Sequence, residues 1–180
     1  FRAVKKRDIL LHFPYQSFDY LIRFLMEADM RDNLEQVVRR NVEIKAAVVA
    51  EDEREQGKRK LLNFGHTLGH AVEKLENFTM HHGHCVGLGC IGAARISQLR
   101  GMLTEEEMAD IRNTFLSFGI PDAAPGLVWE QVLKTTQSDK KVDAGVIRFV
   151  LLKAIGQAYV DTTVTADEMR AGFDVIGGQA

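Results

Sequence analysis

The chain has 180 residues, of which 46% are hydrophobic and 27% are charged. That length is enough for one domain to bury a core without disulfide bonds or a structural metal ion. The 23 lysines and arginines nearly balance the 25 aspartates and glutamates, and the formal net charge is −2. Nucleic acids and anionic membranes bind to positively charged surfaces, so we expect neither as a partner of this near-neutral chain.

The two cysteines, Cys85 and Cys90, lie in an apolar stretch. Their spacing corresponds to about one and a half turns of an α-helix, so the two thiols should face different sides. We predict two buried, unpaired thiols in a reducing compartment. The sequence shows no signal-peptide pattern and no apolar run of about 18 residues, from which we expect a cytoplasmic protein.

The first third of the chain predicts helices. A basic and apolar stretch at 2–11 is typical of a helix, and Pro14 interrupts it because proline has no amide hydrogen to donate. Residues 15–28 repeat apolar side chains at helical spacing and predict a second helix. Asp32 is a typical N-cap for a longer amphipathic helix that runs to about residue 49.

The middle of the chain predicts a charged connection followed by two helices. In the segment 50–60, AEDEREQGKRK, eight of eleven residues are charged, and such a run is usually a solvated connection. Helical patterns follow at 65–77 and 82–100, and Gly101 is expected to end the second helix. Thr104 is expected to cap an acidic helix, since carboxylates in a first turn interact well with the helix dipole.

The last third predicts short elements. The acidic helix should end at Gly119, with a loop at 120–127 and a short helix at 129–136. The segments 146–152 and 157–161 are rich in β-branched and aromatic residues and predict a hairpin, and Thr165 is expected to cap a final helix. The sequence thus predicts a mainly α fold with one small β-hairpin.

Histidines are concentrated in the segment 61–95, which holds five of the six in the chain. His66 and His70 are four residues apart on a predicted helix, so both rings project from one face and could share a ligand. Neutral imidazole nitrogens suit a divalent metal such as zinc. An antiparallel helix hairpin would bring the start of the next helix back over this face. The sequence therefore predicts a metal site that is completed by one of three further histidines: His81, His82 and His84.

Charged groups near this cluster suggest an anionic substrate. A catalytic zinc ion usually has three protein ligands and one open position, and several carboxylates are candidates for the third ligand. Spacing does not choose among Glu43, Asp52, Glu53, Glu55 and Glu73. Arg59 and Asn63 would share the face of His66 if that helix started early. A guanidinium matches phosphate or carboxylate groups, which indicates a small anionic substrate, and Lys45, Lys140 and Lys141 would add positive charge.

The segment GLGCIG at 87–92 has the glycine spacing of a dinucleotide-binding loop. That spacing is meaningful only between a strand and a helix, and the residues before it, HHGHCV, do not predict a strand. The small residues are better explained as a face against which another helix packs closely. The chain therefore shows no nucleotide-binding domain of its own.

Four segments, VEIKAAVVAEDERE, LLNFGHTLGHAVE, HHGHCVGLG and SDKKVDAG, closely resemble the C-terminal domain of the 3-dehydroquinate synthase family. The likeness continues through the predicted hairpin and covers nearly the whole chain. The family is similar in fold to the iron-containing alcohol dehydrogenases, in which an NAD-binding domain precedes a helical metal domain. The resemblance implies that residues 1–180 form a single metal- and substrate-binding domain, with the N-terminal NAD-binding domain absent from this chain.

The resemblance also implies an activity. Family members convert the seven-carbon sugar phosphate DAHP to 3-dehydroquinate with loss of phosphate, in the shikimate pathway of aromatic amino acid biosynthesis. They use zinc or another divalent metal together with NAD, and the resemblance suggests a cytoplasmic homodimer. We expect this chain alone to be inactive. A related sugar-phosphate cyclase of the 2-deoxy-scyllo-inosose or valiolone type, or a non-catalytic metal-binding helical domain, are the alternatives.

Site residues follow from the resemblance position by position. His66 and His82 match the metal ligands, whereas His70 matches a residue that faces substrate and its phosphate. The remaining substrate-facing positions match Lys45, Arg59, Asn63 and Lys140, and Glu55 matches a further active-site position. Two positions depart from the family pattern: Ala3 stands where the family has its third ligand, a glutamate, and His84 stands where it usually has a glutamate.

Overall fold

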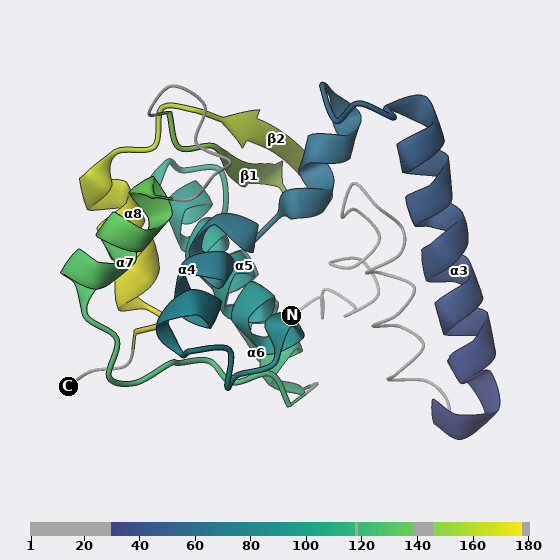
Figure 1. The fold of residues 1–180 in the computed structure, drawn as a ribbon, viewed down its shortest axis with the longest axis horizontal. Coiled ribbons are helices and arrows are strands. Elements are labelled where there is room, and N and C mark those ends of the chain that lie inside the picture. The colour runs from purple at the N-terminus through teal and green to yellow at the C-terminus, as the bar shows by residue number, and fades with distance from the viewer. Residues whose placement is uncertain (1–29, 118, 139–145, 178–180) are drawn as a thin grey trace. The chain divides into compact units, whose positions relative to one another are not determined.

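The structure, a computed structural model, describes residues 30–117, 119–138 and 146–177 (Figure 1). These residues are mostly helical and form one two-stranded sheet, which confirms the predicted fold class. None of the described helices is long and apolar enough to cross a membrane. In chain order the elements are α3 (Met30–Glu51), the 3-10 helix η1 (Lys58–Asn63), α4 (His66–Leu75), α5 (His82–Leu99), α6 (Glu105–Ser117), α7 (Trp129–Gln137), β1 (Phe149–Ala154), β2 (Gln157–Asp161) and α8 (Ala166–Asp174).

The chain divides into two compact units. Residues 1–62 and 154–158 form the first unit, and residues 63–153 and 159–180 form the second. The expectation of one domain over the whole chain stays a prediction, because the first unit includes residues outside the described ranges. In the first unit the helix predicted to run to about residue 49 is confirmed as α3, but the prediction that Asp32 is its N-cap is wrong, because the helix already includes Met30 and Asp32 lies inside it. The two helices predicted before it lie outside the described residues.

Asp52 organises the charged connection that follows α3. Its carboxylate accepts hydrogen bonds from the backbone N–H groups of Gln56, Gly57 and Arg59 at 2.8–3.0 Å. These bonds, with that from Arg59 contributing most, lower the pKa of the Asp52 carboxyl. The segment is largely exposed, as expected, but it is an ordered turn that leads into η1. The sequence analysis did not predict η1. The turn before it is held by hydrogen bonds from backbone N–H groups to one side chain, and such bonds require no periodic pattern of hydrophobic residues.

Helix α5 is the centre of the second unit. It contacts α4, α6 and α8, and α7 packs against α4 (Figure 1). Leu88, Ile91 and Ile96 of α5 are fully buried among these helices, as are Leu151 and Leu152 of β1. Burial of such side chains supplies most of the stabilisation of a small core, about 1.5–3 kcal/mol for each one. Both cysteines are buried and unpaired, as predicted.

Glycines bring α4 and α5 into close contact. A Cβ atom on Gly89 would overlap the carbonyl oxygen of Gly65, and one on Gly69 would lie 2.8 Å from the carbonyl oxygen of Cys85. A Cβ atom on Gly92 would likewise lie 2.9 Å from the carbonyl oxygen of a glycine in α8. The segment at 87–92 is therefore a helix-packing face, as the sequence indicated.

Local end signals are confirmed for the later helices. Gly101, with φ 71°, follows the last residues of α5. Thr104 and Glu107 form a reciprocal capping pair at the start of α6, with N···O distances of 2.8 and 3.1 Å. Thr165 forms a full capping box at the start of α8. These signals are readable from the sequence because each involves residues no more than three positions apart.

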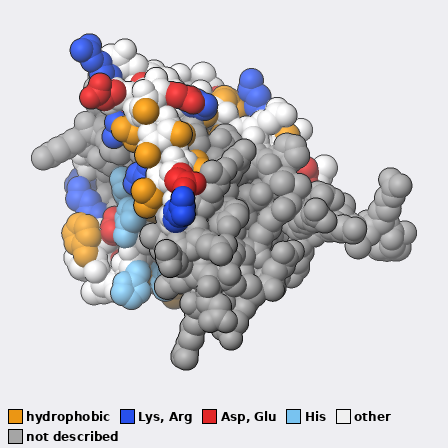
Figure 2. Space-filling view, turned by 90° about the vertical axis from the view of Figure 1, so that its right-hand side faces the viewer, with side chains coloured by type: hydrophobic (Ala, Val, Ile, Leu, Met, Phe, Trp, Pro, Cys, Tyr) orange, Lys and Arg blue, Asp and Glu red, His pale blue; other side chains and the backbone are white. Residues whose placement is uncertain are grey.

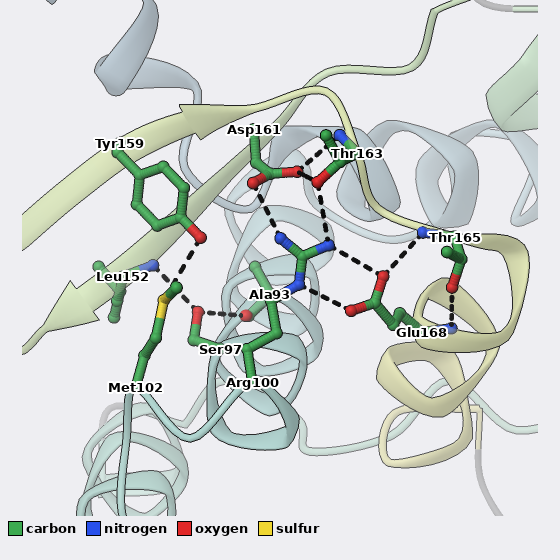
Figure 3. Close-up of polar contacts among 10 residues, drawn as sticks. All are labelled: Ala93, Ser97, Arg100, Met102, Leu152, Tyr159, Asp161, Thr163, Thr165 and Glu168. Carbon is green, nitrogen blue, oxygen red and sulfur yellow. Dashed lines mark hydrogen bonds and ion pairs between the residues drawn. The ribbon is translucent and has the colours of Figure 1, made fainter.

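The hairpin matches its prediction in β2, whereas β1 starts three residues later and extends further than expected. Val146, at the predicted start, is 40% exposed and lies outside the strand. The buried hydroxyl of Ser97 anchors the hairpin to α5, because it donates to the carbonyl of Ala93 and accepts from the N–H of Leu152 (Figure 3).

Arg100 links the end of α5 to the start of α8 (Figure 3). Its guanidinium donates to both carboxylate oxygens of Glu168 at 2.7 and 2.9 Å, and to Asp161 at 2.8 Å. The hydrogen bond from Arg100 is the largest cause that lowers the pKa of Glu168 to about 2. Glu168 is also the capping-box partner of Thr165. The same carboxylate therefore caps the start of α8 and joins α8 to the end of α5 through Arg100.

Candidate metal centre

Helix α4 begins at His66 because Gly65 sets its first turn. Gly65 has φ 79° and is buried, and a Cβ atom at this position would lie 2.6 Å from the backbone N of Cys90. Only glycine combines the left-handed conformation with so close an approach of another helix. His66 thus occupies the first position of α4, and His70 follows one turn later on the same face.

The structure brings three histidine rings together. The ring centroids of His66 and His70 lie 5.2 Å apart, and that of His82 lies 5.6 Å and 5.8 Å from them. One ring nitrogen of each residue lies within 4.8 Å of the others. Zinc takes imidazole nitrogens at about 2.0–2.1 Å, so small ring rotations would let the three converge on one ion. The donor set fits a divalent metal.

Acceptor groups behind two of the rings support this fit. The Nδ1 atom of His66 lies 3.2 Å from the carbonyl oxygen of Phe64, and that of His82 lies 3.1 Å from Glu73 Oε1. A carbonyl and an ionised carboxylate can only accept hydrogen bonds, so Nδ1 carries the proton in both contacts. In the neutral ring the lone pair is then on Nε2, and this is the form in which histidine binds a metal.

The cluster reaches solvent on one side. Figure 2 shows pale blue histidine side chains at the molecular surface. The His82 side chain is 54% exposed, whereas His66 and His70 are half-buried. A catalytic metal needs an open coordination position that substrate can reach, and this arrangement provides partial cover together with access.

The remaining two histidines of the segment lie beside the cluster. The rings of His81 and His84 form an edge-on pair with centroids 5.6 Å apart. Within the described part of the chain, the convergent group contains neither of them. The ring of His84 therefore lies outside the convergent group, and its supporting role stays a prediction.

The structure shows different surroundings for the five carboxylates that the sequence offered as candidates for the third metal ligand. Glu43 pairs with the Arg39 guanidinium at 3.0 Å on α3, and Asp52 binds backbone N–H groups. Glu53 is exposed, and Glu55 is half-buried with φ 53°. Glu73 contacts a histidine of the cluster, with its Oε1 atom 3.1 Å from His82 Nδ1. Its role depends on helix register, which the spacing of residues did not show.

The predicted substrate-facing residues fall into separate groups. Asn63 is the last residue of η1 and belongs to the same unit as the histidines. Lys45, Glu55 and Arg59 belong to the first unit, where Lys45 is exposed and Arg59 donates to the carbonyl of Glu53 at 2.8 Å. Since α4 starts at His66, Arg59 and Asn63 lie on the separate helix η1 and do not extend the histidine face.

Two further predicted positions lie outside the described residues. They are Lys140 and Ala3, the latter standing at the position of the family's third ligand. The assignments made to them from the resemblance stay predictions.

The fold is shared with solved structures of two kinds of synthase. The 2-epi-5-epi-valiolone synthase of Streptomyces hygroscopicus, with NAD+ and Zn2+ bound, superposes with a TM-score of 0.74 at 21% identity, over 94% of this chain and 51% of that protein. A 2-deoxy-scyllo-inosose synthase, complexed with carbaglucose-6-phosphate, NAD+ and Co2+, superposes with a TM-score of 0.71 at 16% identity, over 97% of this chain and 54% of that protein. These structures define the fold class as that of such synthases.

Sequence comparison defines the family. The family model described as 3-dehydroquinate synthase C-terminal matches residues 14–142. The 3-dehydroquinate synthase of Haemophilus ducreyi is 40% identical over 162 residues, which cover 87% of this chain and 44% of that protein. The 3-dehydroquinate synthase of Nitrosospira multiformis is 41% identical over 152 residues, which cover 83% of this chain and 42% of that protein. The chain belongs to the 3-dehydroquinate synthase C-terminal family, and it spans less than half the length of these relatives.

Proposed function

We propose that this chain is the metal- and substrate-binding part of a 3-dehydroquinate synthase, a lyase that converts DAHP to 3-dehydroquinate with loss of phosphate. One observation carries the proposal: three histidine rings converge in a chain that is 40% identical to a 3-dehydroquinate synthase. The shikimate pathway, a cytoplasmic location and a homodimer belong to the same proposal.

His66 and His82 are the proposed protein ligands of zinc or another divalent metal. Their Nδ1 atoms contact acceptors, which leaves Nε2 of both rings as the atom available to a metal. When bound, the metal would polarise a substrate oxygen, and NAD, held mainly by a part of the enzyme outside this chain, would take and return a hydride. Zn2+ or Co2+ with NAD+ in the two synthase structures supports this cofactor set.

His70 is the proposed substrate-facing residue of the cluster. Its ring lies 5.2 Å from that of His66, close enough to meet a substrate held at the metal. A protonated imidazole there would donate a hydrogen bond to the phosphate group and stabilise the negative charge that grows as the carbon–oxygen bond breaks. His70 is thus proposed to act on the leaving phosphate. One of its ring nitrogens also lies within 4.8 Å of a ring nitrogen of His66 and of His82, so metal binding by His70 is the alternative.

Cations and polar groups complete the proposed substrate site. Lys45, Arg59 and Lys140 would bind the phosphate and carboxylate of the substrate, since a guanidinium pairs with such groups in bidentate fashion and an ammonium adds a point charge. Asn63 would supply an amide, and Glu55 a carboxylate. Fixed charges of this kind hold the substrate in place before any bond breaks.

A second candidate is a cyclase that acts on another sugar phosphate. The likeness of fold to valiolone and deoxy-inosose synthases favours it, but those proteins are only 21% and 16% identical to this chain. The 3-dehydroquinate synthases at about 40% identity outweigh that likeness.

The test uses the full-length protein with NAD and zinc, and measures phosphate release from DAHP together with formation of 3-dehydroquinate. We expect turnover, and we expect its loss in His82→Ala. Turnover of sedoheptulose 7-phosphate or glucose 6-phosphate in place of DAHP would contradict the proposal and favour the second candidate.

A further inference from the structure

The packing of α4 on α5 sets the register between the two helices. Gly65 lies against Gly89, and one turn further along α4, Gly69 lies against Cys85. Each turn forward on α4 therefore matches one turn back on α5, as in an antiparallel helix pair. One more turn brings Glu73 level with the start of α5, at its N-cap His81 and its first residue His82.

Glu73 and His82 make the contact that this register allows. The carboxylate Oε1 atom of Glu73 lies 3.1 Å from His82 Nδ1. The two side chains differ in exposure, at 19% for Glu73 and 54% for His82. Glu73 thus comes from a packed turn of α4, whereas His82 projects into solvent from a helix end. The carboxylate of Glu73 therefore restrains a side chain that is more than half exposed.

The backbone around Glu73 is also fixed. Its carbonyl oxygen accepts a hydrogen bond from the N–H of Phe78 at 3.0 Å, which closes the turn between α4 and α5. Within the described residues, the group with convergent ligand atoms does not include Glu73. Its carboxylate therefore contacts Nδ1 of His82 without belonging to the convergent group itself.

We propose that Glu73 is a positioning residue that holds His82 in the Nδ1–H form and presents its Nε2 lone pair to the metal. This inference rests on the proposed function, because it needs His82 to be a ligand. Carboxylate partners of this kind raise the basicity of a histidine ligand and fix the orientation of its ring, and their removal typically weakens metal binding about 10- to 100-fold.

The zinc affinity of the full-length protein, measured by competition with a chelator, tests the proposal. We expect Glu73→Ala to weaken zinc binding about 10- to 100-fold, and Glu73→Gln to weaken it less, since the amide oxygen still accepts from Nδ1–H. The matched control is Glu76→Ala, which removes a carboxylate three positions along the chain at the end of the same helix and should leave affinity unchanged. A zinc affinity of the Glu73→Ala variant within twofold of the wild-type affinity would overturn the proposal.

The tautomer of His82 gives a second readout that a purely structural role would not change. Nitrogen NMR of the metal-free protein should show Nδ1 protonated and Nε2 bare in wild type, and a shift toward the Nε2–H form in Glu73→Ala. A wild-type His82 in the Nε2–H form would overturn the proposal even if the alanine variant failed to fold. If wild type bound no zinc, or if His82→Ala bound it normally, the proposed function itself would fail.

Discussion

Gly89 of α5 packs directly on the carbonyl oxygen of Gly65, and no side chain fits between them. The contact fixes how far α4 slides along α5. The positions of His66 and His82 relative to each other depend on that register, so the geometry of the histidine cluster begins with two glycines.

The first prediction concerns this contact. Gly89→Ala should lower the free energy of unfolding by about 3 kcal/mol, because an added methyl group forces two backbones apart. The control is Gly83→Ala in the same helix, where a Cβ atom would meet nothing within 4 Å. That variant should be neutral or up to about 1 kcal/mol more stable, since alanine favours helix. Urea denaturation measures both, and equal stability of the two variants would contradict the packing account.

The second prediction concerns Arg100 and Glu168. Arg100→Ala should lower the free energy of unfolding at pH 7 by about 2 kcal/mol, because it removes charge-assisted hydrogen bonds from a side chain that is 17% exposed. Arg112→Ala is the control. The side chains of Arg112 and Asp122 are 39% and 38% exposed, so loss of that pair should cost under about 1 kcal/mol. Denaturation at pH 7 that gave the same loss in both variants would contradict the prediction.

The same ion pair predicts a dependence on pH. Glu168 has a pKa lowered from 4.5 to about 2 in the folded state. A carboxyl whose pKa is depressed by folding contributes stability above its unfolded pKa and loses that contribution as pH falls through its folded pKa. Wild type should therefore lose this contribution between about pH 4.5 and about pH 2. Acid titration of Glu168→Gln should show a shallower decline over that range, and an unchanged slope would count against the assignment.

The third prediction separates the roles of the clustered histidines. His70→Ala should keep zinc and lose turnover of DAHP, because His70 is proposed to meet the phosphate. His81→Ala, which alters a ring paired with His84 outside the cluster, should keep both. Atomic absorption measures the zinc content of each variant, and the rate of phosphate release from DAHP measures its turnover. If His70→Ala lost zinc, His70 would be a metal ligand together with His66, as the spacing of these two residues on α4 suggests.

The fourth prediction concerns the thiols. Burial raises the pKa of both Cys85 and Cys90. A protonated, buried thiol is a poor nucleophile, so neither cysteine should react with iodoacetamide in the folded protein at pH 7.5 over the time that labels both in urea. Rapid labelling of the native protein, followed by mass spectrometry, would show that one of the thiols is accessible.

Local signals explain which parts of the fold were predictable. Thr104, Thr165 and Gly101 act on helix ends within three or four residues, and the structure confirms each. The 3-10 helix η1 was missed because Asp52 organises it through backbone hydrogen bonds that have no hydrophobic pattern. The link from Arg100 to Glu168 joins residues far apart in the chain, which no local pattern could show.

The histidine cluster likewise combines features that local sequence patterns predict with contacts that they do not. His66 and His70 could be paired from their helical spacing, and the antiparallel return of His82 was expected from two predicted helices. Glu73 could not be chosen from five nearby carboxylates, because the choice depends on the helix register that Gly65 and Gly89 set. Sequence spacing defines a helix face, whereas contacts between helices depend on how closely their backbones approach.

Zinc binding by the full-length protein tests the central claim most directly. Isothermal titration of the metal-free protein should show about one zinc ion bound per chain, and the double variant His66→Ala/His82→Ala should bind none at that site while it keeps its helical circular dichroism. A wild-type protein that takes up no zinc, or a double variant that binds zinc as wild type does, would contradict the account.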